Sequence, residues 1–126
     1  MRVVVDTNAL MMPIEADVRL FDELDRLLGA AEVLVPAAVI TELEQLAAAG
    51  AGEEARAASV GRDLAERCTP IETPETDADA AVLSAGLRET TDFVVTNDRD
   101  LRRQLLDAGV SVISLRGGHK LAITQP

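Results

Sequence analysis

Carboxylates follow two apolar runs of this 126-residue chain, close to the point where each run ends. Asp6 comes directly after Val3–Val5, and Asp98 comes shortly after Phe93–Val95. Short runs rich in β-branched residues predict buried strands. In a parallel sheet that is covered by helices, ligands bind beyond the carboxyl ends of the strands, so both acids are candidate site residues.

A second pair of acids begins a predicted helix. Asp77 and Asp79 lie at the start of the helix that we expect over 76–89. Asp79 precedes Val82 and Leu83 by three and four residues, so we expect it to point toward the buried side of that helix. An unneutralised carboxylate would be costly there.

A third pair of acids, Glu42 and Glu44, borders the apolar stripe of the helix predicted over 36–48. In a parallel sheet the segments that follow the strands approach the same edge, so the acids of all these segments can converge. The residues alone do not decide between Glu42 and Glu44, or between Asp77 and Asp79.

Converging carboxylates without matching lysines raise one another's pKa or recruit a cation, and hard oxygen ligands favour Mg²⁺ or Mn²⁺ over zinc. One such ion can orient a bound water for in-line attack on a phosphodiester and stabilise the oxyanion that leaves, and a second ion would brace both oxygens. Polar neighbours could hold the carboxylates or a metal-bound water by hydrogen bonds. These neighbours are Thr7, Asn8, Thr96 and Asn97.

Each acid also has a purely structural explanation. Asp6 can close a turn after its strand. Asp98 can cap a helix, the segment 76–79 reads as a variant of a capping box, and Glu42 can be a solvated border residue. Each explanation is adequate for a single acid. Together they do not explain why several acids would lie at one edge of the sheet.

Strands separated by helices predict one α/β domain over 1–126, a three-layer sandwich with a compact parallel sheet of four to five strands. The chain from Ala9 to Pro13 is expected as an apolar connection and 116–126 as a polar tail. The strands are expected at 3–5, 33–35, 93–95 and 110–115, with a short edge strand around Ile71, and the helices at 16–28, 36–48, 53–67, 76–89 and 99–108.

The net charge of −10 argues against a protein that binds nucleic acid through a broad basic face. Bound divalent cations would neutralise part of this negative charge and so weaken that argument. An acidic, lysine-poor surface would also suit a high-salt host, although a GC-rich genome gives a similar bias toward arginine. The local basic cluster consists of Arg99, Arg102, Arg103, Arg116, His119 and Lys120. It could contact RNA phosphates, and for Arg102 and Arg103 the alternative is a solvated helix face.

No apolar run approaches the length of a membrane span and no leader precedes the first strand, so we expect a cytoplasmic protein without a membrane partner. A lone cysteine, Cys68, excludes an internal disulfide, and with His119 as the only histidine a zinc site of the usual kind is not expected. Met11, Met12 and Pro13 are compatible with a small homodimer contact and with a loop packed on its own core.

Four segments in order, VVVDTNALMMP, VLVPAAVITELEQLA, DADAAVLSAG and VVTNDRDLRRQLLDAGVSVISL, resemble the PIN-domain ribonucleases over nearly the whole chain. The resemblance is closest to the archaeal branch related to small-subunit rRNA-processing PIN endonucleases, with the toxins of VapBC toxin–antitoxin pairs as a sibling group. It implies the strand order 3-2-1-4-5 and cleavage of single-stranded or flexible RNA with Mg²⁺ or Mn²⁺, as one or two ions.

The resemblance also selects residues. It implies that the catalytic and metal-binding acids are Asp6, Glu42, Asp79 and Asp98, and that the supporting hydroxyl and amide positions are Thr7, Asn8 and Thr96. Asp100 is an outer ligand in such motifs, although a residue of a helix N-terminus explains it equally well, and Asp77 is a second candidate for that place.

We therefore expect a metal-dependent endoribonuclease that acts in rRNA processing or ribosome maturation, with an RNA substrate and a ribosome-assembly partner. One alternative is a toxin that cuts tRNA or rRNA and is held by an antitoxin. Another is a non-catalytic RNA-binding assembly module. A receiver-like phosphoacceptor domain would need a lysine beyond a late strand, and Lys120 lies too far along the tail to serve well.

Overall fold

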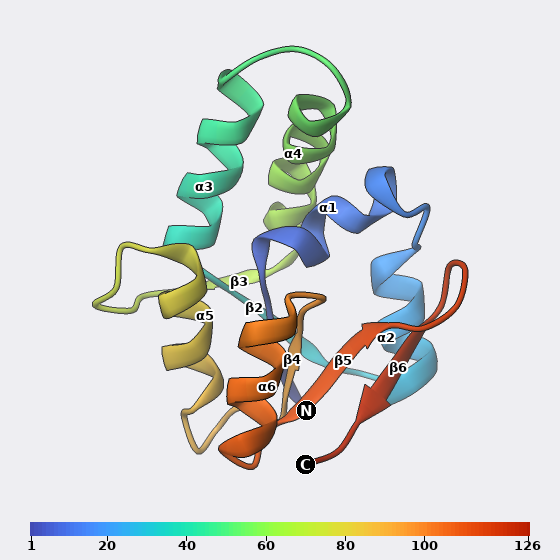
Figure 1. The fold of residues 1–126 in the computed structure, drawn as a ribbon, viewed down its shortest axis with the longest axis vertical. Helices are drawn as coiled ribbons and strands as arrows, with labels where there is room; N and C mark the ends of the chain where they lie inside the picture. Colours follow the sequence, from blue (N-terminus) through green and yellow to red (C-terminus); the bar gives the residue numbers. More distant parts are fainter.

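A six-stranded sheet in the order β3-β2-β1-β4-β5-β6 organises the computed structural model, which describes residues 1–126 (Figure 1). The first five strands run parallel and β6 pairs antiparallel with β5. The predicted order of five strands is confirmed, and a sixth strand extends it. The strands are β1 Arg2–Val5, β2 Glu32–Pro36, β3 Thr69–Ile71, β4 Phe93–Val95, β5 Ser111–Leu115 and β6 Leu121–Thr124.

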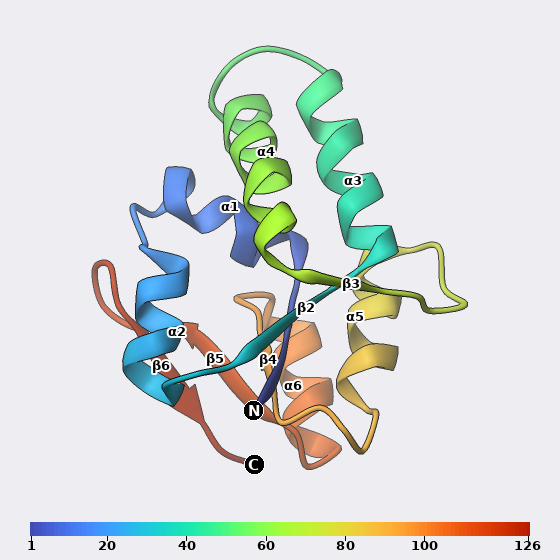
Figure 2. The same ribbon diagram turned by 180° about the vertical axis from the view of Figure 1, so that it is seen from behind.

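Six α-helices flank the sheet: α1 Thr7–Glu15, α2 Leu20–Leu28, α3 Ala37–Ala48, α4 Glu53–Leu64, α5 Ala78–Gly86 and α6 Arg99–Asp107. A 3₁₀ turn at Ala65–Arg67 follows α4. The two opposite views place α5 and α6 on one face of the sheet and α2 against the other (Figure 1, Figure 2). The predicted three-layer α/β fold is confirmed. α3 and α4 pack together and extend beyond the carboxyl ends of the strands.

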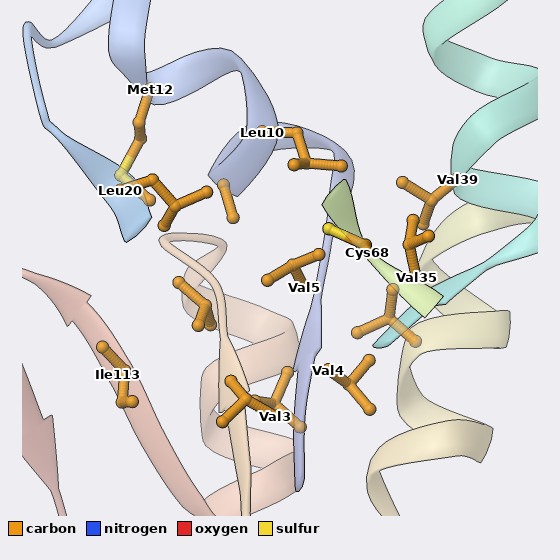
Figure 3. Packing of buried hydrophobic residues seen from close by; sticks show 14 of the residues in the cluster. Val3, Val4, Val5, Leu10, Met12, Leu20, Val35, Val39, Cys68 and Ile113 are labelled. Carbon is orange, nitrogen blue, oxygen red and sulfur yellow. The ribbon is translucent and has the colours of Figure 1, made fainter. Parts of the chain in front are cut away.

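The central strand β1 is buried on both faces. The side chains of Val3, Val4 and Val5 are all 0% exposed, although successive residues of a strand point to opposite sides. Such a continuous apolar run is what a parallel strand between two helical layers requires. Figure 3 shows these valines among core side chains that include Leu10 of α1 and Leu20 of α2, and the lone cysteine, Cys68, is buried in the same core.

The segment that we expected as an apolar connection, Ala9 to Pro13, lies inside the helix α1 instead. The sequence pattern misses this helix because it has no polar face in that stretch and carries Pro13. Met11 and Met12 are each only 3% exposed, so the expected dimer contact through these two side chains is wrong. The alternative, a loop packed on the core, is also wrong, because the residues that pack on the core belong to a helix.

The polar tail expected over 116–126 contains the strand β6. Gly117 and Gly118, with φ of 57° and 47°, form the turn of a hairpin between β5 and β6. On the outer side of the strand, Glu23 of α2 accepts the Leu121 N–H at 2.9 Å, and Arg26 donates to the Leu121 carbonyl at 2.8 Å. These two side chains cap backbone groups that a sheet edge would otherwise leave exposed.

A close approach holds α4 against α1, the helix that begins beside Asp6. A Cβ atom built on Gly61 of α4 would lie 2.8 Å from the carbonyl oxygen of Leu10 in α1. Only glycine therefore fits this contact. None of the helices combines the length and the apolar character that crossing a membrane would require.

Candidate active site

The carboxylate of Asp6 is buried at the carboxyl end of the central strand. Asp6 is 2% exposed and caps α1, because its Oδ1 accepts the N–H of Ala9 at 2.7 Å. The pKa of Asp6 is raised to about 6, chiefly by burial and to a lesser extent by the negative charges of Asp79 and Asp98, while the Thr96 hydroxyl and the Ala9 N–H oppose the rise. The site thus contains a carboxylate that is costly to ionise unless a cation compensates it.

Thr96 connects this carboxylate to the next acid along the sheet edge. Its residue is 0% exposed and follows β4, which lies beside β1. The Thr96 hydroxyl lies beside the Asp6 carboxylate, whose pKa it lowers, and accepts the backbone N–H of Asp98 at 3.0 Å. Asp98 in turn caps α6 by accepting the N–H of Leu101 at 2.9 Å. The capping explanation for Asp98 is therefore correct, and it does not prevent the other carboxylate oxygen from binding a ligand.

Asp79 differs from the expectation that it points into the core, because its residue is exposed in the first turn of α5. The neighbouring residues Ala78, Ala81 and Val82 take the buried positions instead. Asp79 lines a hollow of about 310 Å³ together with Asp98. Partial burial raises the pKa of Asp79, and the charges of Asp98, Asp77 and Glu42 raise it further.

The structure separates the members of each acid pair that the sequence left open. Asp77 caps α5 by accepting the N–H of Ala80 at 3.0 Å, whereas Asp79 faces the hollow. Glu44 is paired with Arg62 at 3.1 Å, whereas Glu42 has no basic partner and lies close enough to Asp79 to raise its pKa. In each pair, one acid therefore has a structural role, as a helix cap or in an ion pair. The other acid, Asp79 or Glu42, has no such role and lies nearer to the remaining acids.

The polar neighbours divide into three kinds. Thr7 is buried, and its Oγ1 has no hydrogen-bond partner. Asn8 is exposed. Asn97 does not hold the carboxylates as we expected: its Oδ1 accepts the N–H of Leu115 at 2.8 Å and its Nδ2 lies 3.2 Å from Sδ of Met12. Asn97 thus joins β5 and α1 to the end of β4.

The donor types at this edge fit a hard divalent cation, because they are carboxylates and hydroxyls without a basic partner. No three His, Cys, Asp or Glu side chains are grouped so that they could hold one ion in this conformation, and ligation by Asp6, Glu42, Asp79 and Asp98 stays a prediction. Mg²⁺ characteristically keeps several of its waters and takes only one or two protein carboxylates. The arrangement fits a hydrated ion of that kind.

Two further side chains of α6 line the acidic hollow, Asp100 and Gln104. Asp100 also lies 3.4 Å from Arg103. We did not single out Gln104 from the sequence. Its position four residues after Asp100, on the same side of a helix, is the signal that would have found it.

The expected basic cluster separates into two parts. Arg99, Arg102 and Arg103 line one hollow on α6. His119 and Lys120 lie in the β5–β6 hairpin and line another, together with Asp17, Arg19, Asp22 and Glu23. Arg116 is exposed at the base of the hairpin turn and lines neither hollow.

Comparisons with known proteins support this assignment of fold. The sequence model of the family described as "PIN like domain" matches residues 3–118. No curated protein sequence matches the chain significantly. Three similar solved structures are each less than 25% identical to the chain, so they bear on the fold alone.

Among these structures, the PIN domain endonuclease Utp24 is similar with a TM-score of 0.79 and 23% identity, over 99% of this chain and 92% of that one. A chain of VapBC2 from Rickettsia felis, solved bound to a promoter DNA fragment, has a TM-score of 0.65 and 14% identity, over 90% and 98%. A domain of a functionally unknown protein from Methanocaldococcus jannaschii has a TM-score of 0.67 and 19% identity, over 94% of each chain.

Proposed function

The chain belongs to the PIN-like domain family, and from that premise we propose that it is an endoribonuclease that hydrolyses RNA phosphodiesters with Mg²⁺ or Mn²⁺. One observation carries the proposal. The buried Asp6 carboxylate lies near Asp79 and Asp98 at the carboxyl edge of a parallel sheet, and none of the three has a basic partner. That edge is where α/β sheets bind ligands.

We assign the residues distinct roles. Asp6, Asp79 and Asp98 would hold the cation, directly or through its waters, and Glu42 would bind it or orient the attacking water. When bound, the ion supplies a Lewis acid and a water of lowered pKa. Thr96 fixes the Asp6 carboxylate and the start of α6 in one geometry, and the free Thr7 hydroxyl and Asn8 complete the polar surroundings. Asp77 and Asp100 are candidate outer ligands.

The ionisation of Asp6 links the stability of the folded protein to the binding of a cation. Because the pKa of Asp6 is raised to about 6, chiefly by burial, the pocket by itself disfavours the charged form of Asp6, and a nearby positive charge would favour it. The desolvation that costs stability in the free protein therefore strengthens the attraction of the pocket for a cation.

For the biological role we propose rRNA processing or ribosome maturation, and the fold likeness to the PIN domain endonuclease Utp24 supports it. A ribosome-assembly protein would then be the partner. The second candidate is a toxin ribonuclease that acts on tRNA or rRNA and is inhibited by an antitoxin, which the likeness to a VapBC2 chain supports. A small antitoxin-like reading frame beside the gene, and arrest of growth on expression alone, would favour the toxin.

The experiment that tests the proposed function is a cleavage assay on rRNA precursors with Mn²⁺ or Mg²⁺ and with EDTA. We expect discrete cleavage products with either ion and none with EDTA. A non-catalytic RNA-binding module predicts RNA affinity that is indifferent to Mg²⁺ and no cleavage at any metal concentration. Absence of cleavage from RNA that the protein nevertheless binds would therefore replace our proposal with that module.

A further inference from the structure

Three arginines gather on one face of α6, which we call the arginine face: Arg99, Arg102 and Arg103. They are spaced at i, i+3 and i+4, the spacing that places side chains over one another on a helix. Together with Leu106 and Asp107 they line a hollow of about 310 Å³. The arginine face is thus a concave positive surface on a protein whose net charge is −10.

The arginine face does not stabilise its own helix. Arg99 is the first residue of α6, and positive charges near a helix N-terminus oppose the helix dipole. Like charges at these spacings also repel one another. The only ion pair is Arg103 with Asp100 at 3.4 Å, between side chains that are 68% and 80% exposed, which contributes little. An anion bound in the hollow would compensate for these unfavourable interactions.

Arg102 is held in place within this face. Its Nη2 donates to Oγ1 of Thr124 in β6 at 3.1 Å, which anchors the guanidinium between the helix and the sheet edge. Its Nε is buried and has no hydrogen-bond partner. It is the rest of the guanidinium that would bind a phosphate, because a planar guanidinium that is fixed in place has the chemistry for it.

α6 separates the arginine face from the acidic hollow. Asp98, Asp100 and Gln104 of the same segment line the acidic hollow, and α5 completes it. In Figure 1, α6 lies between α5 on one side and the hairpin of β5 and β6 on the other. A helix with its side chains is only about 10 to 12 Å wide, so a strand of nucleic acid can contact both sides at once.

Resting on the proposed function, we propose that the arginine face binds a backbone phosphate of the RNA substrate that is not the scissile one. The strand would cross the N-terminal half of α6, with the scissile phosphate at the acidic hollow and a neighbouring phosphate at Arg99, Arg102 and Arg103. This geometry explains how a strongly acidic protein retains a polyanion. The acids repel RNA unless a cation is bound, and the arginine face supplies the compensating attraction at short range.

The test compares two double variants that change the net charge equally. Arg99→Ala with Arg103→Ala removes two exposed members of the arginine face and leaves the anchored Arg102 intact. Arg19→Ala with Arg56→Ala is the matched control, because both residues are exposed and line neither the arginine face nor the acidic hollow. The affinity for a fluorescein-labelled oligouridylate is measured in EDTA by fluorescence anisotropy over a range of salt concentrations.

We expect the arginine-face variant to bind at least about tenfold more weakly, because it loses charge-assisted hydrogen bonds to phosphate. Its plot of log affinity against log salt concentration should become shallower by about 0.7 for each phosphate that the variant no longer neutralises. In the Mn²⁺-dependent cleavage of the same oligonucleotide KM should rise while kcat is retained, because the interaction is the same in the ground state and the transition state.

Equal weakening in the two double variants would overturn the inference while leaving the proposed function intact, provided that the wild-type protein cleaves RNA with Mn²⁺. The same holds if the wild-type protein cleaves RNA but shows no affinity for it in EDTA. No Mn²⁺-dependent cleavage by the wild-type protein would overturn the proposed function itself, and the inference with it.

Discussion

The Thr96 hydroxyl lies beside the Asp6 carboxylate and lowers its pKa, so polar groups from the ends of two neighbouring strands meet at the acidic site. The same oxygen accepts the N–H of Asp98 at 3.0 Å. One buried hydroxyl therefore fixes both the acid that follows β1 and the acid that begins α6.

Replacing Thr96 by valine keeps the shape of the side chain and removes this hydroxyl. The Asp98 N–H is deprived of its partner, and the buried Asp6 carboxylate loses a neighbouring hydroxyl, so we expect the free energy of unfolding to fall by about 1 to 3 kcal/mol. Urea denaturation at neutral pH measures it. Thr41→Val is the control, because that hydroxyl bonds only the Ala37 carbonyl on an exposed helix surface. Equal effects of the two substitutions would contradict the role of Thr96.

Asp6→Asn tests the catalytic assignment. The amide keeps an oxygen that can accept the N–H of Ala9, so α1 retains its cap, but the negative charge is removed. We expect Mg²⁺- and Mn²⁺-dependent RNA cleavage to disappear in gel assays, with far-UV circular dichroism unchanged. Cleavage at the wild-type rate by this variant would remove Asp6 from the reaction.

The same variant gives a stability prediction with a definite sign. The pKa of Asp6 is about 6 in the folded protein and near 3.8 in the unfolded chain, so between these values the folded state binds more protons. The Asp6 contribution to stability is therefore fully present below about pH 4 and is lost as the pH rises through about 6. Asp6→Asn should be more stable than the wild type at pH 7 in EDTA, by up to about 3 kcal/mol.

Thermal unfolding in EDTA measures that difference across the pH range. We expect the melting temperatures of variant and wild type to converge near pH 4 and to separate as the pH approaches 6 to 7. Saturating Mn²⁺ should narrow the gap, because a ligand that binds only the folded state stabilises the wild type more. A gap that is independent of pH would show that ionisation of Asp6 is not its cause.

Glu42 and Glu44 form a matched pair on the helix α3. Glu42→Gln removes a charge that lies near Asp79, so we expect kcat/KM for RNA cleavage to fall substantially while stability is preserved. Glu44→Gln weakens only a partly exposed ion pair with Arg62, which costs about 0 to 1 kcal/mol, and cleavage should be retained. If steady-state kinetics show the larger decrease in the Glu44 variant, the assignment within the pair is reversed.

Much of the architecture could be predicted because the strands carry continuous apolar runs that only a covered parallel sheet explains. Asp6 and Asp98 could be placed at one edge for the same reason, since each follows a strand whose end is easily recognised. α1 could not be recognised, because a helix buried on most of its surface has no amphipathic pattern. β6 could not either, because a four-residue edge strand depends on Glu23 and Arg26 of a distant helix.

Within the site, the sequence showed the kinds of residue but not where their side chains point. Asn97 has the same type and setting as its polar neighbours, yet its amide bonds Leu115 and contacts Met12. Asp79 has the spacing of a buried residue, but alanines beside it fill the space against the sheet and leave the carboxylate at the rim of the hollow. Both outcomes depend on tertiary packing, which local spacing does not encode.

Gly61→Ala tests how far the site depends on the packing of α4 against α1. The added Cβ would lie 2.8 Å from the Leu10 carbonyl oxygen and 3.2 Å from Cδ2 of Leu43, and a backbone atom cannot turn aside as a flexible side chain can. We expect α1 to shift and the free energy of unfolding to fall by about 1 to 3 kcal/mol, measured in urea. Because Asp6 caps α1, RNA cleavage should fall as well.

Gly50→Ala, with no atom within 4 Å of the added Cβ, is the control and should change neither quantity appreciably. A decrease in stability without any decrease in cleavage would show that the acidic edge is fixed by the sheet and Thr96 alone.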